Sequence, residues 1–81
     1  MNLTDTVELM LSDNYKDRFK GEYYQLKERY NRLLKIIFKY EAGILDLKPK
    51  CDVDMLKEQL DAMSNYLYWL EVEAKIEGIE L

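Results

Sequence analysis

Apolar side chains recur along most of this chain at alternating steps of three and four residues, the spacing of one face of an α-helix. One series spans residues 19–40 and a second spans residues 53–74. The members are Phe19, Tyr23, Leu26, Tyr30, Leu33, Ile37 and Tyr40 in the first, and Val53, Leu56, Leu60, Met63, Leu67, Leu70 and Ala74 in the second. Both have heptad spacing, so each predicts a long helix that packs along a seam of the coiled-coil kind.

The two series also match each other when the chain folds back between them. Pairing Phe19 with Ala74 aligns every later member of the first series with a member of the second, as far as Tyr40 with Val53. Two unrelated patterns would rarely agree on a single turn in this way. We therefore expect an all-α domain whose main body is a two-helix antiparallel hairpin in this register.

Capping residues and glycines divide the chain into segments of one domain. The expected segments are a short N-terminal helix (1–12), a second helix (13–42), a loop (43–51) and a third helix (52–78). Ser12, Asp13 and Asn14 are candidate N-caps for the second helix. Gly43 suits the left-handed residue that follows a helix, and Asp52 suits a helix N-terminus.

Further apolar stripes flank the seam. They comprise Tyr24, Leu34 and Phe38 on the second helix, and Met55, Ala62, Tyr66, Trp69 and Ile76 on the third. Because they fall on opposite sides of the hairpin, a bare hairpin would expose an aromatic band on each side, and such bands usually mark an interface. We expect the N-terminal helix to cover one band and a second subunit or a target to cover the other. The candidate interface residues are Leu34, Phe38, Ala62, Tyr66 and Trp69.

Length and composition favour a homo-oligomer. A single core in 81 residues gives only a few kcal/mol of stability. The lone Cys51 allows no internal disulfide, and the lack of histidine removes the common zinc and iron–sulfur ligand sets. We therefore expect no metal and no cofactor, which leaves self-association as the device that adds stability.

Charge and the N-terminus restrict the partners and the location. The net charge of −4 argues against general binding to DNA, RNA or anionic membranes, which need a surplus of lysine and arginine. The N-terminus has neither the basic region nor the apolar stretch of a signal peptide or a membrane span. We expect a cytoplasmic protein.

Catalytic chemistry has little support, so we expect a binding protein and not an enzyme, with no catalytic residues. Nucleophilic triads need a base, and the usual base, histidine, is missing. Glu71 and Glu73 are two residues apart and point to different sides of a helix. Cys51, at the start of the third helix, is better explained as a capping or buried thiol than as a nucleophile.

The charges themselves are unevenly spread. Residues 13–41 hold eight basic and five acidic side chains, whereas residues 52–81 hold two basic and eight acidic ones. This predicts mutual attraction of the two long helices, or a local anion site on the first of them. The candidate ligand-binding residues are Arg29, Arg32, Lys35 and Lys39, with Tyr24 as a residue that could stack on a base. An ordinary solvated basic face is the alternative.

Two sequence blocks, residues 18–26 and 56–66, with residues 71–79 after them, resemble small helical-hairpin proteins of tailed phages and prophages, including relatives in crAss-like phages. The resemblance covers about residues 15–81, and its most characteristic part is Gln59, Met63 and Tyr66. It implies a phage origin. In size and layout the chain is also similar to the phage anti-CBASS sponges, hairpins that assemble into oligomers and sequester cyclic nucleotide signals.

These features together predict a phage-encoded counter-defence protein acting in the cytoplasm of an infected bacterial host. The expected activity is that of an oligomeric sponge for a nucleotide immune signal, such as a cyclic nucleotide or an ADP-ribose derivative. One alternative is a direct inhibitor of a host defence protein, of the anti-CRISPR kind, which would use Trp69 or the acidic face of Asp54, Glu58 and Asp61. Another is a structural helix-pairing module.

Overall fold

The computed structural model describes residues 3–45 and 50–81 of the chain, and all regular structure in these residues is α-helical. The helices are α1 (Leu3–Met10), α2 (Tyr15–Glu41) and α3 (Val53–Glu77). The all-helical class predicted from the sequence is confirmed. Residues 1 and 2 of the expected N-terminal helix and residues 46–49 of the expected loop lie outside the described residues.

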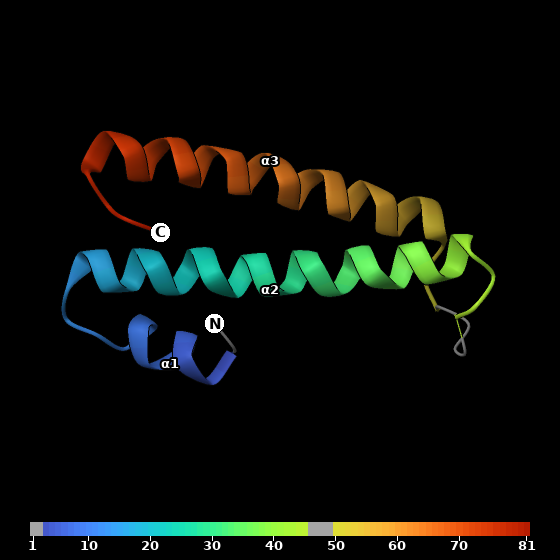
Figure 1. Ribbon diagram of the computed structural model, residues 1–81, viewed down its shortest axis with the longest axis horizontal. Helices are drawn as coiled ribbons and strands as arrows, with labels where there is room; N and C mark the ends of the chain where they lie inside the picture. Colours follow the sequence, from blue (N-terminus) through green and yellow to red (C-terminus); the bar gives the residue numbers. More distant parts are fainter. Residues whose placement is uncertain (1–2, 46–49) are drawn as a thin grey trace.

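Helix α2 is the central element, with α1 and α3 on opposite sides of it (Figure 1). Both α1 and α3 run in the direction opposite to α2 (Figure 1). Within the described residues α2 contacts both of the other helices, whereas α1 and α3 do not contact each other. The molecule is elongated, at 43 × 25 × 17 Å, so a large part of each helix faces solvent.

The helix ends follow the capping residues in the sequence. Asn14 is the N-cap of α2, and its side chain accepts a hydrogen bond of 2.8 Å from the backbone N–H of Lys16. Gly43 follows α2 at φ 72° and Gly78 ends α3 at φ 70°, the left-handed conformation that glycine adopts without strain. The predicted roles of Asn14 and Gly43 are confirmed.

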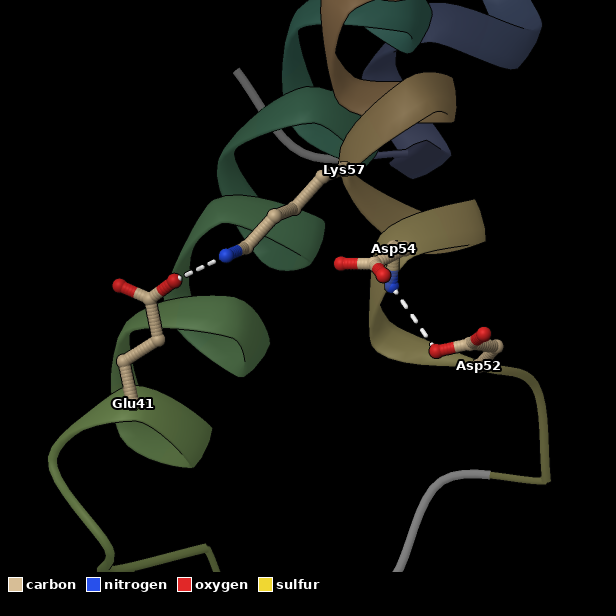
Figure 2. A network of polar contacts seen from close by, with 4 residues as sticks. All are labelled: Glu41, Asp52, Asp54 and Lys57. Carbon is tan, nitrogen blue, oxygen red and sulfur yellow. Dashed lines mark hydrogen bonds and ion pairs between the residues drawn. The ribbon is translucent and has the colours of Figure 1, made fainter.

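One ion pair joins the end of α2 to the start of α3 (Figure 2). Asp52 caps α3 by accepting a hydrogen bond of 3.2 Å from the backbone N–H of Asp54. One turn further on, the Nζ atom of Lys57 lies 2.5 Å from Oε1 of Glu41 on α2 (Figure 2). This hydrogen bond and the attraction of the Glu41 carboxylate raise the pKa of Lys57. Because the Glu41–Lys57 pair is exposed, it orients the end of α2 relative to the start of α3 but adds little to the stability of the fold.

The core lies where the C-terminal half of α3 packs on the N-terminal half of α2. Its buried members are Phe19, Tyr23, Leu67, Leu70, Ala74 and Ile79, with Tyr24, Leu26 and Tyr30 half-buried against them. Ile79 reaches the core because the chain turns back toward α2 after α3 (Figure 1). The Tyr23 hydroxyl donates a hydrogen bond of 2.7 Å to Oε1 of Glu71, which links α2 to α3 at the core edge. Toward the loop, Leu33, Leu56 and Leu60 are only half-buried.

Helix α1 packs on α2 at Gly21, which is buried. A Cβ atom added to Gly21 would lie 2.7 Å from Cγ of Met10 and 3.0 Å from Cβ of Leu9. Thr6 of α1 is fully buried as well. The close approach of the two helices therefore depends on the missing side chain at position 21.

The expected covering of one aromatic band by the N-terminal helix is not observed. On α2, Phe38 remains 69% exposed, and on α3 Trp69 and Ile76 remain 65% and 80% exposed. The physical reason is that α1 packs closely on α2 at Gly21, on the side of α2 away from α3 (Figure 1). Both bands are left open. No helix in the described residues is long and apolar enough to cross a membrane.

Candidate ligand-binding groove

One polar strip runs along α2 where this helix meets α3. Its members, at steps of three and four residues and hence on one helix face, are Glu22, Gln25, Arg29 and Arg32. Two adjoining hollows follow this strip. The first, of about 150 Å³, is lined by Glu22, Gln25, Leu26, Arg29 and Tyr66. The second, of about 250 Å³, is lined by Arg29, Arg32, Leu33, Ile36, Gln59 and Met63. Since Arg29 lines both, we call them together the Arg29 groove.

Of the two arginines in the groove, only Arg32 has a carboxylate within ion-pair distance in the described residues. No carboxylate in the described residues lies within ion-pair distance of Arg29. Arg32 has one neighbour, Glu28, whose Oε1 atom is 4.0 Å from the arginine Nε. Exposed ion pairs at this helical spacing stabilise a helix by only about 0.3–0.5 kcal/mol, so Arg32 can leave Glu28 for a better acceptor. The groove therefore offers two guanidinium groups to an anion.

Tyr66 of α3 lines the smaller hollow of the groove. Its hydroxyl donates a hydrogen bond to Oε1 of Glu22, and its ring is half exposed. The bond to Glu22 is the main reason why the pKa of Tyr66 is raised, with burial second. The ring is thereby held beside Arg29, where a flat aromatic ligand could stack on it.

Tyr66 was expected only at the interface, so this arrangement was not predicted. The signal that could have found it is the hairpin register, which brings position 66 near positions 22–29. That register was applied to the seam and not to the residues that flank it.

The other predicted ligand-binding residues do not join the groove. Tyr24 is half-buried and packs against the core, with its ring centroid 5.2 Å from that of Tyr23. Lys35 and Lys39 are exposed and line neither hollow. At about 100° per residue, Lys35 lies about 120° around the helix from Arg29. Steps of three and four placed four cations on one side of α2, but not on one narrow strip.

The predicted interface residues are all open to solvent. These are Leu34, Phe38, Ala62, Tyr66 and Trp69. The Trp69 ring makes an edge-to-face contact with Tyr68, with centroids 5.1 Å apart, which fixes two large rings side by side on α3. Exposed aromatic side chains of this kind are frequent anchors of protein interfaces.

Another hollow, of about 670 Å³, lies at the C-terminal end and differs in chemistry. It is lined by Tyr23, Glu71, Ala74, Lys75, Ile79, Glu80 and Leu81. Its central carboxylate, Glu71, accepts the Tyr23 hydroxyl, and burial together with this bond raises the pKa of Tyr23 to about 12. With more carboxylates than cations, this hollow suits an anion less well than the Arg29 groove does.

Cys51 is exposed, and the cap of α3 is Asp52. Of the two structural roles considered for this thiol, the structure therefore supports neither a cap nor a buried thiol. It is a free cysteine just outside the helix.

The described residues form a small helical protein in which two arginines of α2 line one hollow of a groove. A family model described as Sequestin matches residues 13–75, more than three quarters of the chain, so the protein belongs to the Sequestin family. The matched region contains the whole of α2, most of α3 and the entire Arg29 groove, and it begins after α1.

A second comparison concerns a much longer protein. The chain is 39% identical over 54 residues to the small ribosomal subunit protein uS2 of Acaryochloris marina (strain MBIC 11017). The aligned region is 67% of this chain but only 18% of that relative. The similarity is therefore to one segment of that protein. No solved structure matches the chain.

Proposed function

We propose that this protein is a sponge, which binds a nucleotide immune signal stoichiometrically and keeps it from its receptor. The observation that carries the proposal is the Arg29 groove, where Arg29 and Arg32 line one hollow and Arg29 and the exposed ring of Tyr66 line the adjoining one. The family name, Sequestin, suggests a sequestering activity and supports the same function. Binding alone is sufficient for a sponge, so the protein acts without catalysis.

Each part of a nucleotide has a counterpart in the groove. Guanidinium groups bind phosphate oxygens through charge-assisted hydrogen bonds, which are shorter and stronger than neutral ones. The Tyr66 ring offers a stacking platform for a base, and the side-chain amides of Gln25 and Gln59 can donate to or accept from its edge. Candidate ligands are a cyclic nucleotide or an ADP-ribose derivative.

The proposal includes a phage origin and action in the cytoplasm of an infected bacterium, supported by the resemblance of residues 18–26 and 56–66 to phage hairpin proteins. It also includes a homo-oligomer. The hollows are shallow in one copy, and the exposed rings around Trp69 give a second copy a surface on which to pack. Assembly would remove water from the groove edges and strengthen the contacts to phosphate.

The test is isothermal titration of the protein with cyclic di-AMP, cyclic di-GMP, cyclic ADP-ribose and ADP-ribose. The double variant Arg29→Ala, Arg32→Ala should weaken binding by roughly a hundredfold or more, because each charged hydrogen bond contributes about 1.5–3 kcal/mol. The matched control is Lys35→Ala, Lys39→Ala, which removes the same charge from the same helix outside the groove. It should change affinity only a few-fold. Equal losses in both variants would contradict a groove site.

The second candidate is a direct inhibitor of a host defence protein, favoured by the exposure of Trp69 and Ile76. If the wild type binds none of the nucleotides, this alternative becomes the better one. Its signature would be co-elution with a defence protein from infected cells, lost on Trp69→Glu and kept in the double arginine variant.

A further inference from the structure

The Arg29 groove contains a carboxylate as well as two arginines. Glu22 lines the end of the groove that is remote from Arg32. It lies seven residues before Arg29, which is two helical turns or about 10 Å along α2. A ligand made of phosphates alone would be repelled by this carboxylate. The groove instead suits a ligand with negative charge at one end and a hydrogen-bond donor at the other.

Glu22 keeps free acceptor capacity. A carboxylate has two oxygens with about four lone-pair positions, and the Tyr66 hydroxyl uses Oε1 alone. No lysine or arginine in the described residues lies within ion-pair distance of Glu22. The existing bond therefore orients the carboxylate without saturating it, and its partner shows that this position accepts an O–H group.

We propose that Glu22 accepts a hydrogen bond from the 2′-hydroxyl of a ribose, so that the ligand is a ribonucleotide and not a deoxyribonucleotide. This rests on the proposed nucleotide sponge and names the part of the ligand that sets specificity. The 2′-hydroxyl is the one that stays free when the 3′-oxygen is esterified, as in a 3′-linked cyclic nucleotide. Carboxylates also read this hydroxyl in dinucleotide-binding folds. Tyr66 is the positioning residue for the carboxylate.

The experiment compares each ligand with its own 2′-deoxy analogue by isothermal titration. The probes are ADP-ribose and cyclic di-AMP, each beside the analogue that lacks the adenosine 2′-hydroxyl. The wild type should favour the ribose form by about tenfold or more, since a site built around a hydroxyl discriminates against its loss. Glu22→Ala should bring this ratio close to one, chiefly by weakening binding of the ribose form.

Two further variants separate this role from general effects. Tyr66→Phe keeps the ring but loses the hydroxyl, so it should reduce the ratio while binding of the deoxy form is preserved. Glu58→Ala removes an exposed carboxylate of α3 that lines neither hollow, and it should leave the ratio unchanged. Each variant should keep the wild-type helical circular dichroism. Because the ratio is measured within one variant, a small loss of active protein does not alter it.

The outcomes separate the two proposals. Nucleotide binding without preference for the ribose form would overturn the role of Glu22 and leave the sponge intact. The same follows if Glu22→Ala retains the wild-type ratio. If the wild type binds neither ribose probe, the role of Glu22 fails together with the ligand class on which it rests.

Discussion

Replacing Gly21 by alanine should detach α1 from the rest of the protein. The added Cβ would lie 2.7 Å from Cγ of Met10, 3.0 Å from Cβ of Leu9 and 3.0 Å from the backbone nitrogen of Met10. The Met10 side chain can rotate away from the first contact. The other two contacts involve atoms fixed by the helix, so α1 must shift as a unit to relieve them.

The magnitude follows from two opposing terms. Alanine at a helix interior is favoured over glycine by about 1 kcal/mol. This gain is present whether α1 is docked or not, so it cancels from the docking equilibrium and stabilises only α2. Overpacking costs about 1–3 kcal/mol and acts on the docked state alone. Docking of α1 should therefore weaken by that amount, a factor of roughly 5–150.

Hydrogen exchange followed by mass spectrometry measures this directly. A helix of eight residues is marginal on its own, so undocked α1 unfolds and exchanges its amides. Gly21→Ala should reduce protection in α1 by roughly 5–150-fold and leave α3 unchanged. Adding Met10→Ala removes only the contact to Cγ and should restore protection in part. Unchanged protection in α1 would refute the assignment of Gly21 as the docking point.

Three other substitutions test the core, the acid–base chemistry and the open face. Leu67→Ala should lower the free energy of unfolding in urea by about 2–5 kcal/mol, since this buried side chain lies between α2 and α3, whereas the exposed Ser64→Ala should change it little. Tyr23→Phe should lower stability at pH 8 by about 1 kcal/mol through the lost hydrogen bond to Glu71. The pKa of Tyr23 is raised to about 12 in the folded protein, compared with about 10 in the unfolded chain. The stabilisation from its hydroxyl is therefore complete below pH 10 and is lost as the pH rises toward 12. The difference in the free energy of unfolding between wild type and Tyr23→Phe should narrow above pH 10. Trp69→Glu should reduce the mass measured by light scattering while helicity is retained, whereas the exposed Asn65→Glu should leave the mass unchanged. A wild-type protein that is monomeric at all micromolar concentrations would refute the role of the open face in self-association.

The long helices and their ends were predictable because they depend on local sequence. The extent of α2 and α3 follows from the three- and four-residue spacing. Their ends follow from the N-caps Asn14 and Asp52 and from the two left-handed glycines. The position of α1 was not predictable in the same way. Gly21 lies inside the predicted second helix, and only the packed structure identifies it as the point where another helix approaches.

The candidate site was predicted only in part. The spacing of residues along one helix shows which of them share a face, but not which residues of another helix pack against that face. Arg29 and Arg32 were expected at an anion site and do line the groove. Tyr66 lies on α3, more than thirty residues after Arg29 in the sequence. Whether the two line the same hollow depends on how α3 lies against α2. Tyr24 was the predicted stacking residue, but it packs against the core.

Net charge is a poor guide to what this protein can bind, because the opposite charges of its two long helices are mostly not paired with each other. In the described residues the one ion pair between α2 and α3 joins Glu41 to Lys57, at the loop end. At physiological ionic strength, charges more than about 8 Å apart are largely screened from one another. An anion in the Arg29 groove therefore interacts mainly with the two arginines and with the carboxylates nearest to the groove, Glu28 and Glu22. The acidic excess elsewhere on α3 acts more weakly, so a chain of net charge −4 can still present a local site for phosphate.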